Sequence, residues 1–146
     1  MVLINENSKR RGDIAEAHII ARLIEVGYNV LKPLGDNARY DLVIEDNEGH
    51  FLKVQCKLAW ISKQNTGCFT FATASSYAHT RAGQKAGHGR KGYVGEIDYF
   101  AVYCKETGEV YLVPIQDAPT TGMWLRFEAT RNRQTKGVKW AKDYEI

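Results

Sequence analysis

The 146-residue sequence has few cysteines and prolines, and it contains no long hydrophobic run. The three cysteines are widely separated, a pattern that excludes a disulfide framework or a cysteine-based zinc site. No apolar stretch approaches the roughly 20 residues that span a bilayer, and the segment Met1-Val2-Leu3-Ile4 is too short for a secretory signal. These absences predict a cytoplasmic protein whose thiols are reduced.

The overall composition is typical of a folded chain. Hydrophobic residues make up 44% of the sequence and charged residues 25%, which excludes a disordered polyelectrolyte. The length suits one domain with a proper core, so we predict a single domain over residues 1–146. The formal net charge of +3 is too small to indicate a nucleic-acid partner by itself.

Hydrophobic spacing predicts one helix followed by strands. The helix is expected from near Lys9 or Gly12 to Val26. Its buried stripe should contain Ile14, Ala17, Ile20 or Ala21, and Ile24, widened by Ile19 and Leu23. Residues 75–95 lack apolar rhythm and predict a long loop with a short helical piece near 75–78. Residues 137–144 are a further helical candidate. Strands are expected at 28–32, 40–45, 51–57, 68–74, 97–104, 109–114 and 123–128. This order predicts an α+β or α/β fold in which one mixed sheet packs against the first helix.

A polar face on the hairpin of residues 40–57 is the most informative feature. If the turn is centred on Glu48, Asp41 lies opposite Gln55. Side chains alternate along strands, so Asp41, Gln55 and Lys57 share the face opposite an apolar one. Asp41 and Gln55 are then placed to hold an oxygen-preferring cation between them. The alternative is an ordinary solvated face with an Asp–Lys ion pair.

Glu16 adds a second carboxylate if the helix packs across this hairpin. Two carboxylates, an amide oxygen and a lysine form a suitable site for Mg²⁺, which prefers oxygen ligands and often meets phosphate. A bound metal of this kind acidifies water and stabilises charge on a phosphoryl group. Lys57 would orient or deprotonate that water, or neutralise the developing charge.

These residues resemble a known motif. Asp41, a hairpin and Gln55-Cys56-Lys57, preceded by the helical segment Gly12-Asp13-Ile14-Ala15-Glu16-Ala17, resemble the PD-(D/E)XK nuclease superfamily. The closer likeness is to the small bacterial endonucleases that include group I intron-encoded homing enzymes. It extends over nearly the whole chain, through blocks at residues 35–42, 96–103, 111–114 and 139–144.

The resemblance implies a restriction-endonuclease-like fold with a central mixed β-sheet flanked by helices. It implies Mg²⁺ as cofactor, with Mn²⁺ able to substitute, and Asp41, Gln55, Glu16 and the backbone carbonyl of Cys56 as metal ligands. Glu16, Asp41, Gln55 and Lys57 would form the catalytic group. Gln55 stands where the motif usually has an acid, so the site has one negative charge fewer and should bind metal more weakly. Tyr40 replaces the proline of the motif name.

Basic residues gather in the entry segment, in the 75–95 stretch and in the C-terminal tail. Together with a phosphodiester-type site, they predict a surface that contacts DNA phosphates; individually, each stretch is equally well explained as solvated loop. Arg39 is expected either near the scissile phosphate or as an ion-pair partner of Asp36. The predicted DNA-binding residues are Arg39, Arg81, Lys85, Arg90, Lys91, Arg131, Arg133 and Lys136.

The sequence therefore predicts a Mg²⁺-dependent, site-specific double-stranded DNA endonuclease of homing type. A duplex has two strands to cut, so a homo-oligomer, dimer or tetramer, is expected. One alternative is a structure-specific nuclease resembling a Holliday-junction resolvase. Another is a non-catalytic DNA-binding module on the nuclease fold, in which Gln55 has abolished turnover.

Overall fold

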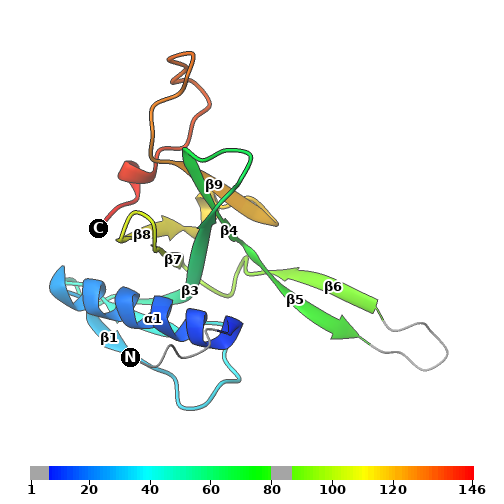
Figure 1. Cartoon of the computed structure of the whole chain (residues 1–146). Coiled ribbons are helices and arrows are strands. Elements are labelled where there is room, and N and C mark those ends of the chain that lie inside the picture. The colour runs from blue at the N-terminus through cyan, green and yellow to red at the C-terminus, as the bar shows by residue number, and fades with distance from the viewer. Residues whose placement is uncertain (1–6, 80–86) are drawn as a thin grey trace, which may run out of the picture.

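The computed structural model describes residues 7–79 and 87–146, and it consists of one large sheet, a smaller two-stranded sheet and a helix (Figure 1). Two single-turn 3-10 helices, η1 (Ile115–Asp117) and η2 (Ala141–Asp143), lie in the C-terminal third. The remaining elements are α1 (Ser8–Glu25), β1 (Asn29–Leu31), β2 (Leu42–Glu45), β3 (Phe51–Ile61), β4 (Cys68–Ala72), β5 (Ala74–His79), β6 (Gly87–Gly92), β7 (Tyr99–Cys104), β8 (Glu109–Pro114) and β9 (Gly122–Arg126).

Strand β3 is the centre of the seven-stranded sheet. It pairs antiparallel with β2 near its start, parallel with β7 along its middle and antiparallel with β4 at its end. Val54 is paired with Leu42 of β2 and also with Tyr99 of β7, so these two strands flank β3 on opposite edges. The predicted mixed sheet is therefore confirmed. The predicted hairpin register is confirmed for Val43 opposite Lys53 and Glu45 opposite Phe51, whereas the predicted pair of Asp41 and Gln55 is not part of the ladder.

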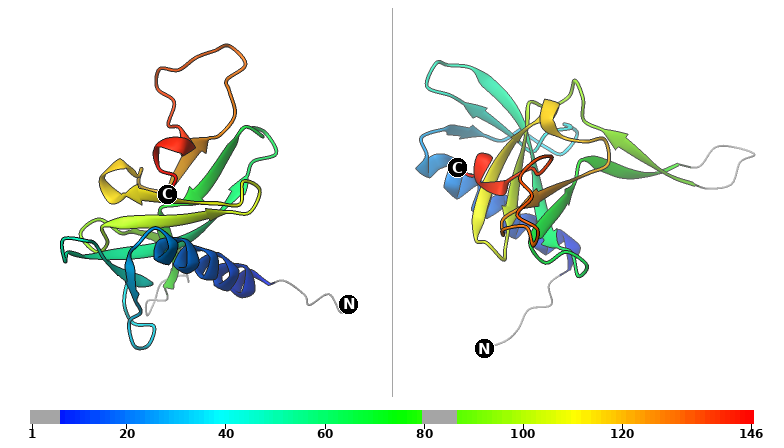
Figure 2. Two further views of the ribbon diagram at one scale, coloured as in Figure 1. Left: turned by 90° about the vertical axis from the view of Figure 1, so that its left-hand side faces the viewer. Right: turned by 90° about the horizontal axis from the view of Figure 1, so that it is seen from above.

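Helix α1 packs on one face of this sheet (Figure 2). The side chain of Asn7 caps its first turn by accepting a hydrogen bond of 2.9 Å from the amide of Arg10. The buried residues of the helix are Ala15, Ile19 and Leu23, which recur every fourth position. They pack against a cluster from the sheet that includes Leu42, Ile44, Val54 and Ala101.

The predicted buried stripe of α1 is only partly correct, because Ile19 and Leu23 are buried but the positions predicted at its centre are not. Ile14 is 37% exposed, Ile24 is 57% exposed, and Ala17 also lies at the surface. Apolar residues occur on more than one side of this helix, so spacing alone does not select the buried face. The sheet selects it, because α1 packs mainly across β3 and β7.

The opposite face of the sheet carries the second and larger core. Phe100 and Val102 of β7 point into it, together with Phe69 and Phe71 of β4. Strand β9 completes this layer by pairing with β4, and Ala141 of η2 closes it. Since the two cores lie on opposite faces of β7, every side chain of that strand except the half-exposed Tyr99 is buried.

The long loop predicted for residues 75–95 is wrong, because β5 and β6 pair antiparallel there from Ala74 opposite Gly92 to His79 opposite Gly87. The short helical piece predicted near 75–78 lies within β5 and is also wrong. This hairpin extends away from the main sheet (Figure 1), so it has no core face to impose an apolar alternation. The helix predicted at 137–144 is reduced to the single turn of η2.

No helix within the described ranges is long and apolar enough to cross a membrane. Cys56, Cys68 and Cys104 are free thiols, and the last two are buried. The expectation of unpaired cysteines is thus confirmed.

Two isoleucines of α1 provide a test of which face is buried. Ile19→Ala should lower the free energy of unfolding by about 2–5 kcal/mol, because Ile19 is fully buried and its truncation leaves a cavity. Ile24→Ala, on the exposed side, should change it by about 0.5 kcal/mol or less. Urea unfolding followed by circular dichroism measures both; equal losses would contradict the observed helix orientation.

Candidate active site

Asp41 stands where β2 and β3 separate. Its backbone amide donates to the carbonyl of Val54 at 2.9 Å, and its carboxylate Oδ2 accepts a hydrogen bond from the amide of Cys56 at 2.9 Å. The paired positions of the hairpin end at Leu42, so the ladder does not continue to a regular Asp41–Gln55 pair. The amide of Cys56 thus donates to the Asp41 carboxylate where a regular ladder would offer a backbone carbonyl, and this bond fixes the Asp41 side chain against β3.

Several charged groups act on Asp41. Burial raises the pKa of the Asp41 carboxyl, and the hydrogen bond from the Cys56 amide opposes this rise. The negative charge of Glu16 raises the pKa of Asp41 further, whereas Lys57 and Lys32 lower it. The residues predicted from two distant segments, Glu16 on α1 and Lys57 on β3, are therefore electrostatic neighbours of Asp41.

Glu16 approaches the site from the helix side of β3. Cys56 belongs to the core beneath α1, whereas Gln55 and Lys57 alternate to the other face of the strand. The charge of Glu16 nevertheless acts on Asp41, so a shared site of Glu16, Asp41 and Gln55 stays a prediction. Its side chain forms an ion pair with Lys32, which follows β1. This hydrogen bond to Glu16 raises the pKa of Lys32.

The thiol of Cys56 has no role as a ligand or nucleophile in this arrangement. Burial is the main cause that raises the pKa of this thiol, and the charges of Asp41 and Glu16 raise it further. The group therefore stays protonated at neutral pH. Any contribution of Cys56 to metal binding must come from its backbone carbonyl, as the resemblance implies.

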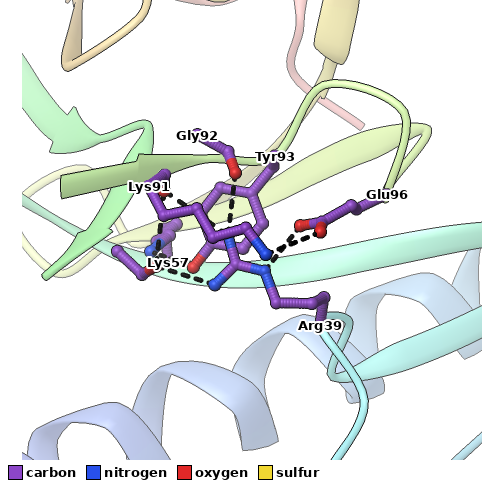
Figure 3. Close-up of polar contacts among 7 residues, drawn as sticks. Arg39, Lys57, Lys91, Gly92, Tyr93 and Glu96 are labelled. Atoms are coloured by element: carbon purple, nitrogen blue, oxygen red, sulfur yellow. Dashed lines mark hydrogen bonds and ion pairs between the residues drawn. The ribbon is translucent and has the colours of Figure 1, made fainter. Parts of the chain in front are cut away.

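A second group of polar residues surrounds Lys57 on the other face (Figure 3). The ammonium of Lys57 donates to the hydroxyl of Tyr93 at 3.3 Å. The guanidinium of Arg39 lies 4.2 Å from the centroid of the Tyr93 ring and donates from Nε to Glu96 at 2.6 Å. Of the two expected alternatives for Arg39, an ion pair is present, but its partner is Glu96 and not Asp36.

Sequence reasoning did not assign Lys32, Tyr93 or Glu96 to the site. Tyr93 lies between Gly92 and Val94, Glu96 lies in a turn, and Lys32 follows the short strand β1. Glu96 begins the block at residues 96–103 that resembles the family, but neither Lys32 nor Tyr93 belongs to a motif. A Tyr that is 4% exposed in a glycine-rich stretch is identified as part of the site only by its contacts.

The predicted DNA-binding residues fall into two separate regions. Arg90 and Lys91 are exposed on β6, and Lys91 also pairs with Glu96 at 3.1 Å. The exposed residues of the second region lie between β9 and η2, in a loop that extends from the end of the molecule opposite α1 (Figures 1 and 2). These are Arg131, Arg133 and Lys136. Arg81 and Lys85 lie outside the described residues.

A cluster in the turn between β2 and β3 is a turn motif. Ligand atoms of Asp46, Glu48 and His50 lie within 4.8 Å of one another. However, Oδ1 of Asp46 accepts hydrogen bonds of 2.9 Å from the amides of both Glu48 and His50, and Oδ2 lies 3.0 Å from the ring of His50. The carboxylate thus stabilises the turn.

The donors around Asp41 fit a hard divalent cation. They are carboxylate, amide and carbonyl oxygens, the atoms that Mg²⁺ and Mn²⁺ prefer. The charge of Glu16 raises the pKa of the half-buried Asp41 carboxyl, and a cation bound beside both groups would oppose this effect. The residues Asp41, Glu16, Gln55 and the carbonyl of Cys56 therefore fit the metal that the resemblance implies.

Comparisons with known proteins identify the class. The family described as PD-(D/E)XK endonuclease matches residues 6–146, so this chain belongs to that family. A solved structure, that of the bacterial homing endonuclease I-Ssp6803I, is similar with a TM-score of 0.74 and 29% sequence identity. The match covers 96% of this chain and 89% of that chain. A comparison with curated proteins finds no significant match.

The burial of Asp41 predicts a pH-dependent cost to stability. Since its pKa is raised in the folded state, the folded protein binds this proton more tightly than the unfolded chain, and stability falls as pH rises through the interval between the two pKa values. In metal-free buffer, Asp41→Asn should therefore be more stable than wild type at neutral pH. The difference should vanish in acid, where the wild-type carboxyl is protonated. Chemical unfolding at a series of pH values measures this; a destabilised Asp41→Asn at neutral pH would contradict it.

The ion pair between Lys32 and Glu16 predicts competition with a metal. Lys32→Met removes a positive charge and frees the carboxylate of Glu16, so binding of Mn²⁺ without DNA should tighten about two- to fivefold, the range of an exposed ion pair. Isothermal titration calorimetry measures the affinity. Lys63→Met, an exposed lysine beyond the far end of β3, is the control and should leave it unchanged.

Proposed function

We propose that this chain is a divalent-metal-dependent endonuclease of homing type that hydrolyses phosphodiester bonds of double-stranded DNA at specific sites. The observation that carries the proposal is the placement of Asp41. It is held by the amide of Cys56 at the strand edge, with the charges of Glu16 and Lys57 acting on it. Family membership and the likeness to I-Ssp6803I support the same activity.

Each residue of the group has a separate task. Asp41 and Glu16 supply the negative charge that holds Mg²⁺ or Mn²⁺, and Gln55 and the Cys56 carbonyl supply neutral oxygens. When bound, the metal provides Lewis-acid stabilisation of the phosphoryl group and a more acidic water. Lys57 places its ammonium beside this group and stabilises the negative charge that develops on the phosphate oxygens. Because Gln55 is uncharged, one metal ion per site is favoured over two.

Basic side chains would hold the duplex. Arg90 and Lys91 at the base of the β5–β6 hairpin lie nearest the site, since Lys91 contacts Glu96 and Glu96 contacts Arg39. The loop containing Arg131, Arg133 and Lys136 is remote from it, so we assign that loop to DNA flanking the cut. A homo-oligomer with two sites would cut both strands. Three free cysteines agree with action in the cytoplasm.

Cleavage of a DNA library of random sites tests the activity. Wild type with Mg²⁺ should cut a defined subset of sites. Asp41→Ala and Lys57→Ala should each lower the single-turnover rate at least about 100-fold, because each removes a charge that the transition state requires. Sequencing of the cut ends measures the sites, and gel electrophoresis measures the rate.

Lys63→Ala is the matched control and should cut like wild type. Equal cleavage rates for wild type and Lys57→Ala would contradict the nuclease proposal. Binding of DNA without cleavage, with either Mg²⁺ or Mn²⁺, would point to a non-catalytic module. Cleavage of a four-way junction in preference to every linear site would point to a resolvase.

A further inference from the structure

Tyr93 joins two cations that come from different parts of the chain (Figure 3). Its ring is buried and packs edge-on against Phe100, with ring centroids 5.5 Å apart. Phe100 is the strand partner of Gln55, so the ring lies directly over the predicted catalytic segment. The guanidinium of Arg39 lies 4.2 Å from the ring centroid, and the ammonium of Lys57 lies 5.0 Å from it.

The half-buried side chain of Arg39 is held by acceptors from three segments of the chain. Its Nε donates to Glu96 at 2.6 Å, Nη1 donates to Ser75 Oγ at 2.7 Å, and Nη2 donates to the carbonyl of Gly92 at 2.8 Å. All three guanidinium nitrogens thus have partners, and two of these partners lie on the strands β5 and β6. Arg39 therefore fastens the base of the hairpin to the ring of Tyr93.

We infer that Arg39 and Tyr93 are positioning residues for Lys57, and that they link the β5–β6 hairpin to the catalytic group. This inference rests on the proposed nuclease function. Lysine has a flexible four-carbon stem, so a defined position for its ammonium requires an acceptor and a surface. The hydroxyl of Tyr93 is the acceptor, and the face of its ring attracts a cation.

This arrangement changes the role expected for Arg39. All three nitrogens of the Arg39 guanidinium already have partners, so Arg39 links the hairpin to the site structurally. The exposed Arg90 and Lys91 are then the residues that contact phosphate. DNA that contacts β6 would bind the strand that ends at Gly92, and the carbonyl of Gly92 accepts a hydrogen bond from Arg39. Correct seating of the hairpin therefore determines how firmly Tyr93 holds Lys57.

Tyr93→Phe tests the inference with the least disturbance. It removes the hydroxyl and keeps the ring against Phe100, so the fold and the DNA affinity should stay unchanged. The single-turnover rate at saturating DNA should fall about tenfold or more, because a hydrogen bond to a charged group is lost. Thermal unfolding and DNA titration, measured beside the rate, separate this effect from a structural one.

Two further variants complete the test. In Lys57→Ala, adding Tyr93→Phe should cause no additional loss of rate, because a positioning residue acts only through the residue that it positions. The control is Tyr111→Phe on β8, which removes the hydroxyl of another buried tyrosine; this hydroxyl donates to Thr107 at 2.9 Å. The Tyr111→Phe variant should cut DNA like wild type.

The outcomes separate this inference from the proposed function. If wild type cuts DNA and Tyr93→Phe cuts at the same rate, the positioning role is overturned and the nuclease proposal stands. If Tyr93→Phe slows cleavage equally with and without Lys57, the ring acts independently of the lysine and the inference is also overturned. If wild type cuts no DNA, both fail.

Discussion

The structure depends on strand β3, which is paired along both edges and packed on both faces. Val54 meets β2 on one side and β7 on the other, so the strand has no freedom to shift its register. A shift of one residue would move Lys57 into the core beneath α1 and Cys56 onto the opposite face. The alternation of Gln55, Cys56 and Lys57 between the faces is thus enforced by pairing and burial together.

The charges of the site are balanced before any cation is present. Glu16 has Lys32, and Asp41 has the Cys56 amide together with the nearby charge of Lys57. Burial nevertheless raises the pKa of Asp41, so keeping this carboxyl ionised lowers the stability of the folded protein. Costs of this kind are common at functional sites, where ligand binding offsets them.

On the other face of β3, one buried tyrosine brings two basic side chains close together. The negative face of an aromatic ring allows Arg39 and Lys57 to approach the same group without an acid between them. Glu96 and Ser75 then hold Arg39 from the hairpin side. The hairpin that extends from the sheet is therefore connected to Lys57 of β3 through side-chain contacts as well as through the backbone.

The sequence by itself determined the hairpin register from Val43 to Phe51 and the approximate bounds of α1, because these depend on local alternation and spacing. The order of the elements predicts the mixed sheet, and residue type and spacing predict the motif residues Asp41, Gln55 and Lys57. The sequence did not determine which face of α1 is buried, since Ile14, Ile19 and Ile24 are equivalent until the sheet selects among them. The sequence also did not predict strands β5 and β6, because a two-stranded ribbon without a buried face shows no alternation of apolar and polar residues. Only the tertiary structure decided that Lys32, Tyr93 and Glu96 join the site, because their roles come from contacts between segments far apart in the chain.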